Sequence, residues 1–62
     1  MCLSNVYLIT DDKEELVCEY ASSVEVEGDR IYLTDVIGQE IALTGKIINV
    51  DLIKNQIKVK AG

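Results

Sequence analysis

The sequence predicts an all-β protein, a small five-stranded antiparallel barrel of the SH3 or Sm type. Its apolar residues occur in short runs rich in Val, Ile, Leu and Tyr, separated by Gly, Asp and Asn, which is typical of strands. Around two predicted turns, apolar and charged residues alternate in matching registers. The chain has only 62 residues and no internal repeat or linker, so we expect residues 1–62 to form a single domain.

The first strand is expected over residues 3–10, where consecutive apolar residues give an apolar character to both faces. Both faces should therefore be covered. The acidic residues 11–15 should turn the chain, and a second strand should follow over residues 16–21. Its apolar face is expected to carry Leu16, Cys18 and Tyr20.

A hairpin is expected around Gly28 and Asp29, because a two-residue turn tolerates glycine where a positive φ is required. This turn places the apolar pairs Val24–Leu33 and Val26–Ile31 on one face and the charged pair Glu27–Arg30 on the other. A slip of one residue would destroy that separation. The predicted pairs are Glu27 with Arg30, Val26 with Ile31, Glu25 with Tyr32, and Val24 with Leu33.

A second hairpin is expected around a turn at Lys54 and Asn55. The residues between the hairpins predict a loop over 35–40 and a strand over 41–50, which Gly45 would allow to bend. The second turn would pair Leu52 with Ile57, Val50 with Val59, and Asp51 with Lys58.

Some apolar residues are left over by this arrangement. Ile47 and Ile53 fall on the face opposite Ile48, Val50 and Leu52, and so small a barrel cannot bury both faces. Exposed apolar surface commonly marks an interface, and a two-fold dimer is the commonest closed assembly. We therefore predict a homodimer.

The charge balance disfavours nucleic-acid binding, because 6 basic against 11 acidic residues leave a net charge of −5. The local excess of Lys54, Lys58 and Lys60 is explained by a solvated strand face. No apolar stretch approaches the ~18–20 residues of a membrane helix, and no signal peptide is evident, so we expect a cytoplasmic protein with reduced thiols.

Enzymatic chemistry is also disfavoured. The chain has no His, so neither a Ser-His-Asp nor a Cys-His site is possible within it. The acidic residues 11–15 lack the spaced ligands and glycine of a calcium loop and are interpreted as a solvated turn. No glycine-rich phosphate loop is present either. We expect a protein that is not an enzyme.

Cys2 is the candidate metal ligand, because a thiolate beside the chain end can combine with backbone nitrogen. If Met1 is removed, the free amine and the thiolate close a five-membered chelate ring. If Met1 is retained, the thiolate can bind together with a deprotonated backbone amide. Such N,S donors suit late divalent metals that accept planar geometry, above all Ni(II) and Cu(II). Two copies of Cys2 across a dimer axis would fill four positions.

Simpler interpretations exist for both cysteines. Cys2 can be a small apolar residue at the start of a strand. Cys18 alternates with core residues, so we expect burial to raise its thiol pKa and keep it unreactive. A Cys₄ zinc site from two chains is arithmetically possible, but the CxxC pairing of such sites is missing.

Several short motifs occur together in an order that resembles the CooT family of small accessory proteins. They are residues 1–8 (MCLSNVYL), 24–31 (VEVEGDRI), 45–47 (GKI) and 50–52 (VDL). The resemblance implies a homodimeric Ni(II)-binding protein, a metallochaperone that helps to mature the nickel site of carbon monoxide dehydrogenase, with Cys2 as the metal ligand. Cys18 has no counterpart in the family motif. The resemblance also implies the partners of the protein, which are that nickel enzyme or its accessory proteins.

Two other functions remain open, and a second resemblance is weaker. The HypC-type hydrogenase chaperones are also small barrels that begin with Met-Cys, but they carry a Pro soon afterwards and this chain has none. An Sm-like RNA-binding protein would use a cluster of lysines: Lys46, Lys54, Lys58 and Lys60. A metal-free interaction module in enzyme assembly would use the exposed Ile47 and Ile53.

Overall fold

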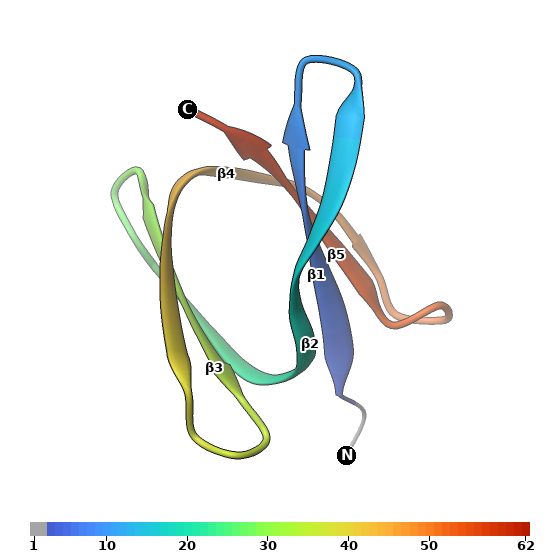
Figure 1. Cartoon of the computed structure of the whole chain (residues 1–62), viewed down its shortest axis with the longest axis vertical. Helices are drawn as coiled ribbons and strands as arrows, with labels where there is room; N and C mark the ends of the chain where they lie inside the picture. Colours follow the sequence, from blue (N-terminus) through green and yellow to red (C-terminus); the bar gives the residue numbers. More distant parts are fainter. Residues whose placement is uncertain (1–2) are drawn as a thin grey trace.

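The computed structural model describes residues 3–62 and shows a closed barrel of five strands (Figure 1). Neighbours along the chain pair in an antiparallel manner, as predicted, whereas the closing pair of the first and last strands is parallel. This follows from the odd strand number, because strands that alternate in direction return to the starting direction at the fifth. The strands are β1 (Ser4–Thr10), β2 (Lys13–Glu27), β3 (Arg30–Asp35), β4 (Glu40–Asp51) and β5 (Gln56–Ala61).

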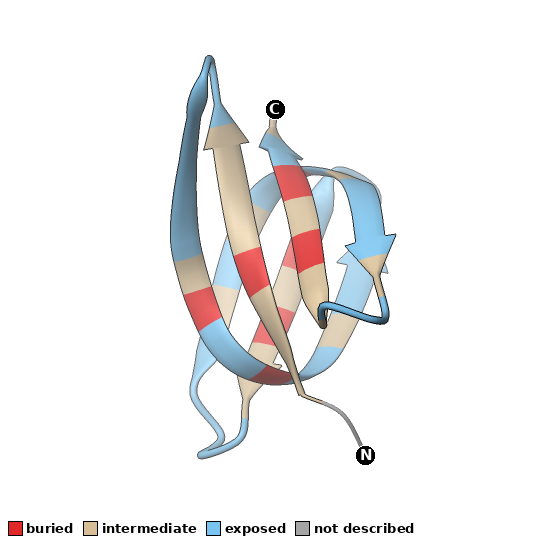
Figure 2. Cartoon of the chain, turned by 90° about the vertical axis from the view of Figure 1, so that its right-hand side faces the viewer, coloured by how far each residue is buried: buried red, intermediate tan, exposed pale blue. Residues whose placement is uncertain are grey.

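The core lies inside the barrel, and within residues 3–62 it consists of apolar side chains and Cys18. Figure 2 shows its buried segments distributed over several strands of the barrel. Burial of each large apolar side chain contributes about 1.5–3 kcal/mol, so this small cluster holds the barrel closed. Within residues 3–62, no helix has the length and apolar character needed to cross a membrane. The fully buried large side chains are Val6, Ile31, Leu33 and Val59.

β2 differs most in length from the expectation. The predicted strand at 16–21 and the first arm of the hairpin form one strand of 15 residues, and the preceding turn is confined to Asp11 and Asp12. Register shifts against β1 and β3 mark bulges along β2, and bulges bend a strand so that it can serve two sides of a barrel.

The bulges also change which side chains of β2 face inward. Cys18 is buried, as predicted, but Leu16 and Tyr20 are 46% and 52% exposed, so their expected place on a core face was wrong. A strict two-residue alternation does not survive an extra residue in the strand.

The β2–β3 hairpin confirms its prediction. Gly28 has a φ of 62° in the two-residue turn, and the register pairs Glu27 with Arg30 and Val24 with Leu33. Ile31 and Leu33 are fully buried. Because the glycine sets the turn and the alternation sets the faces, the register has no competing solution here.

The β4–β5 hairpin contradicts its prediction. Its turn contains four residues, 52–55, and Asp51 pairs with Gln56 rather than with Lys58. The Oδ1 atom of Asp51 accepts hydrogen bonds from the backbone nitrogens of Ile53 at 3.0 Å and Lys54 at 2.9 Å. This side-chain turn holds the wider loop and sets the observed register.

The changed register inverts part of β4. A register shift between Ile47 and Asn49 leaves Ile47 packed against the core, while Ile48, Val50 and Leu52 are exposed, opposite to the prediction. Ile53 is exposed, as predicted. β4 also curves around the barrel (Figure 1). β4 also contains Gly45, where a Cβ atom would collide with the carbonyl oxygen of Lys60.

Candidate metal centre

Cys2, the predicted ligand, lies outside the described residues together with Met1. The first described element after Cys2 is β1. Asn5 fixes the start of β1 from two directions. Its backbone nitrogen donates to the carbonyl oxygen of Asn55 at 2.9 Å, and its Oδ1 atom accepts from the backbone nitrogen of Tyr20 at 3.1 Å. The beginning of β1 is thus bonded to both of its neighbours, β2 and the turn before β5.

Exposed apolar side chains flank this end of the barrel. The β4–β5 turn (residues 52–55), which contains Asn55, exposes 78% of Leu52 and 94% of Ile53. The β3–β4 loop (residues 36–39) exposes Val36 and Ile37, and it is tied to β2 because the Val36 nitrogen donates to the Tyr20 carbonyl oxygen at 3.0 Å. Figure 1 shows the chain entering β1 between this loop and this turn.

Cys18 is a buried thiol in the wall of the barrel, and it is 4% exposed. Burial raises the pKa of Cys18, and the nearby Asp35 carboxylate raises it further. At neutral pH the thiol therefore keeps its proton, whereas a metal ligand must be a thiolate. The expectations that Cys18 is buried and that burial raises its pKa are confirmed.

The charged groups of residues 3–62 do not assemble a metal site. Among the described residues, no group of three or more His, Cys, Asp or Glu side chains is placed to hold a metal ion. The acidic residues around the β1–β2 turn are exposed, and Glu14 forms an ion pair with Lys58 at 3.3 Å. The charges around this turn are thus accounted for by exposure to solvent and by one ion pair.

The lysines of the RNA-binding alternative are only partly brought together. Lys46 lies directly opposite Lys60, and Lys58 is two residues away along β5. Lys54 lies in the β4–β5 turn, and Lys58 is already paired with Glu14. A short row of lysines is a small positive surface beside a net charge of −5.

Two residues of this region escaped sequence analysis. Asn5 was visible as a polar residue within an apolar strand, which is a signal that its side chain has a specific partner. Tyr20 has a φ of 58°, a conformation that is uncommon for a bulky residue. The residue type does not predict this positive φ, because the φ results from the bulge in β2.

Comparisons with known proteins agree with this architecture. The family model for "CO dehydrogenase accessory protein CooT" matches residues 1–60. A crystal structure named "putative CooT from Carboxydothermus hydrogenoformans" superposes with a TM-score of 0.90 and 23% identity, covering 98% of each chain. No curated protein sequence matches. The match over nearly the whole chain shows that this protein belongs to the CooT family of CO dehydrogenase accessory proteins.

Proposed function

We propose that this protein is a homodimeric nickel carrier that binds one Ni(II) per dimer through Cys2 of each subunit. It passes the ion to a nickel-containing carbon monoxide dehydrogenase during assembly, or stores it for that purpose. The family description supports the accessory role, which is non-catalytic. The observation that carries the proposal is the exposed apolar β4–β5 turn bonded, through Asn55, to the start of β1.

The covalent chain connects this surface to the proposed ligand. Three peptide units separate Cys2 from Asn5, so the Cα atoms of the two residues are at most about 11 Å apart. Two protomers that bury Leu52 and Ile53 against each other would bring both chain ends to the same interface. Dimerisation and metal binding are thereby coupled: the apolar contact positions the sulfurs, and the ion joins the protomers.

The chemistry is thiolate capture. Each Cys2 supplies a sulfur, and a nitrogen from each chain end completes a planar four-coordinate set suited to Ni(II). Release of the ion to a client is favoured by protons, because they compete with the metal for sulfur. The affinity for nickel should therefore fall as the pH is lowered.

The experiment is a Ni(II) titration followed by thiolate-to-metal charge-transfer absorption, with native mass spectrometry of the same samples. We expect the absorption band to saturate at one nickel per two chains. Cys2→Ala should abolish the band, whereas Cys18→Ala should leave it unchanged, because the Cys18 thiol is buried and protonated.

The matched cysteine variants also separate the alternatives. An unchanged band in Cys2→Ala would refute the assigned ligand. A dimer that binds no transition metal in either form would favour the metal-free interaction module. Intact masses from the same spectra show whether Met1 is removed, and so which nitrogen, the amine or the amide, accompanies the sulfur.

A further inference from the structure

β2 carries an unpaired edge. Its N-terminal half pairs with β1 as far as Ala21, and its C-terminal half pairs with β3 from Ala21 onward. Among residues 3–62, no strand lies along the other side of residues 13–19. Figures 1 and 2 both show this half of β2 at the outer margin of the barrel, with β1 on one side only.

The backbone of this edge is free to accept another strand. Alternate residues of an antiparallel strand direct their N–H and C=O groups away from the partner strand. Thr10 and Lys13 close the two-residue turn, so the next pair leaves the N–H and C=O groups of Glu14 directed outward, followed by those of Leu16. Unpaired groups of this kind are a template for strand addition.

A groove of about 360 Å³ lies at the C-terminal end of this edge, where Val17 and Glu19 contribute to its lining. β3 stops pairing with β2 at Asp35, and the chain turns away into the β3–β4 loop. An added strand would occupy the line along which β3 would have continued. Its side chains would meet the groove, whose apolar lining includes Val17, Tyr20, Ile37 and Ile41.

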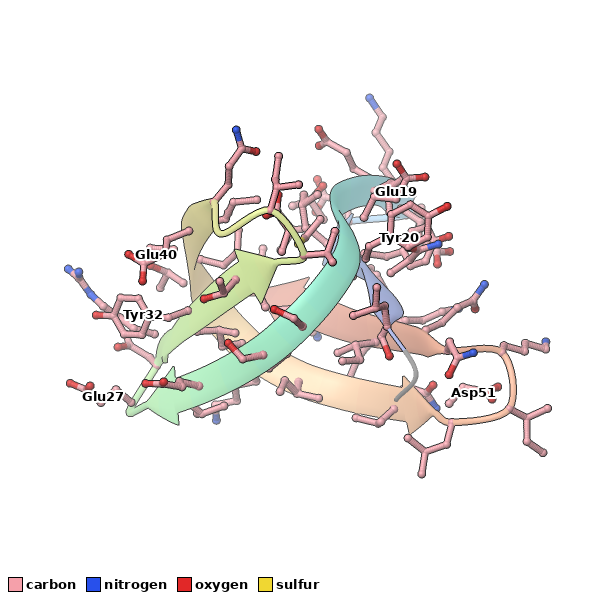
Figure 3. The ribbon with its side chains drawn as sticks, turned by 90° about the horizontal axis from the view of Figure 1, so that it is seen from below. Glu19, Tyr20, Glu27, Tyr32, Glu40 and Asp51 are labelled. Carbon is pink, nitrogen blue, oxygen red and sulfur yellow. The ribbon has the colours of Figure 1, made fainter. Side chains whose placement is uncertain are left out.

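The charge of the edge selects the occupant. Residues 11–19 contain five acidic residues and one basic residue, and Figure 3 shows Glu19 projecting from β2 away from the barrel. Among residues 3–62, one of these acidic residues, Glu14, forms an ion pair, with Lys58. Pairing of this edge with the same edge of a second copy would oppose like charges, which is destabilising. A strand that carries Lys or Arg would meet complementary charge.

We propose that the free edge of β2 over residues 13–19 binds an extended, Lys- or Arg-rich segment of a partner protein by strand addition. Backbone hydrogen bonds supply the affinity, and the groove takes an apolar side chain of the segment. The inference is independent of nickel binding, because the edge is formed by residues of the barrel wall and not by Cys2.

The probe is a capped peptide of about eight residues that alternates Lys or Arg with Val, titrated into the full-length protein and followed by amide NMR. Two isomers of this peptide carry N-methyl groups on alternate peptide bonds. One isomer is methylated on the odd-numbered bonds and the other on the even-numbered bonds, so each loses the N–H groups along one edge of the strand. We expect shifts at the amides of Glu14 and Leu16 and around the groove. One isomer should bind at least about tenfold more weakly than the parent peptide, and the other like the parent.

Charge variants provide the second arm. Glu15→Lys with Glu19→Lys should weaken binding by at least about tenfold. Glu25→Lys with Glu27→Lys makes the same change in net charge on the other half of β2 and should change binding less than about twofold. Equal effects of the two variant pairs, or equal binding of the two N-methylated isomers, would overturn the proposal.

Two further readouts complete the test. Protection of the Glu14 and Leu16 amides that rises with protein concentration, without peptide, would assign the edge to a second copy and overturn the proposal. Peptide binding that persists in Cys2→Ala, which removes the proposed nickel ligand, would support it. The test therefore gives a result even if the protein binds no nickel.

Discussion

The two hairpins that complete the barrel use their apolar residues differently. In the β2–β3 hairpin a two-residue turn directs Ile31 and Leu33 into the core, where both are fully buried. In the β4–β5 hairpin a four-residue turn and a bulge leave Leu52 and Ile53 in solvent. Both hairpins contain large apolar side chains, and the geometry of the turn decides whether these side chains are buried or exposed.

The two hairpins therefore contribute to different properties of the protein, one to its core and the other to its surface. The β2–β3 hairpin stabilises the barrel, whereas the β4–β5 turn forms an apolar surface at the end where β1 begins. A chain of 62 residues has few large apolar side chains to spare. That several remain exposed near the start of β1 is the physical reason for proposing a dimer interface there.

The largest contrast is expected from truncating one leucine in each hairpin. Leu33→Ala should lower the free energy of unfolding by about 2–5 kcal/mol, because it leaves a cavity in the core. Leu52→Ala should change it by less than about 0.5 kcal/mol in dilute protein. Urea unfolding followed by circular dichroism measures both values. Comparable losses would mean that the two hairpins contribute equally to the core.

The turn of the β2–β3 hairpin offers the next largest effect. Gly28→Ala should cost about 1–2 kcal/mol, because an L-residue resists the positive φ of 62°. The open space around Gly28 leaves conformation as the sole cause. Gly28→Asn, which tolerates this φ, should recover most of the loss. Equal destabilisation of Gly28→Ala and Gly28→Asn in urea would contradict this explanation of the role of Gly28.

The side-chain turn of the β4–β5 hairpin should contribute less. Asp51→Ala removes the acceptor of two backbone hydrogen bonds and should cost about 1 kcal/mol. Asp51→Asn keeps an Oδ1 acceptor and should cost less. Hydrogen exchange at the Ile53 and Lys54 amides reports the turn directly. If both amides remain equally protected in the alanine variant, Asp51 does not set this register.

The smallest effect concerns Cys18 and appears only at alkaline pH. Its raised pKa means that the folded protein holds the thiol proton more tightly than the unfolded chain does. The stability contribution is therefore complete below the ordinary thiol pKa of about 8.5 and is lost as the pH rises toward the raised value. Urea unfolding at about pH 7 and about pH 10 should show a larger decrease for the native chain than for Cys18→Ala. Equal decreases in the two proteins would contradict this.

The sequence predicted what strict alternation controls. The pairs from Val24–Leu33 to Glu27–Arg30 followed from one glycine turn. Cys18 is buried as predicted, but Leu16 and Tyr20, with which it was expected to share a core face, are exposed. The five strands and the barrel were also predictable, because apolar runs separated by turn residues leave few other arrangements.

The remaining features depend on interactions that alternation does not encode. Either register of the β4–β5 hairpin gives an apolar face, and Asp51 decides between them by bonding to the backbone. The positive φ of Tyr20 arises from a bulge, and a bulge depends on how β1 and β3 meet the same strand. At the candidate site, Cys2 stays a prediction from sequence chemistry and lies outside the described residues, while the anchoring by Asn5 required the structure.

X-ray absorption at the nickel K-edge of the nickel-loaded, full-length protein tests whether Cys2 of both subunits binds the metal. We expect two sulfur scatterers per nickel, with nitrogen completing the shell, and the loss of both sulfurs in Cys2→Ala. A nickel shell of nitrogen and oxygen alone, or one that is unchanged in Cys2→Ala, would contradict it.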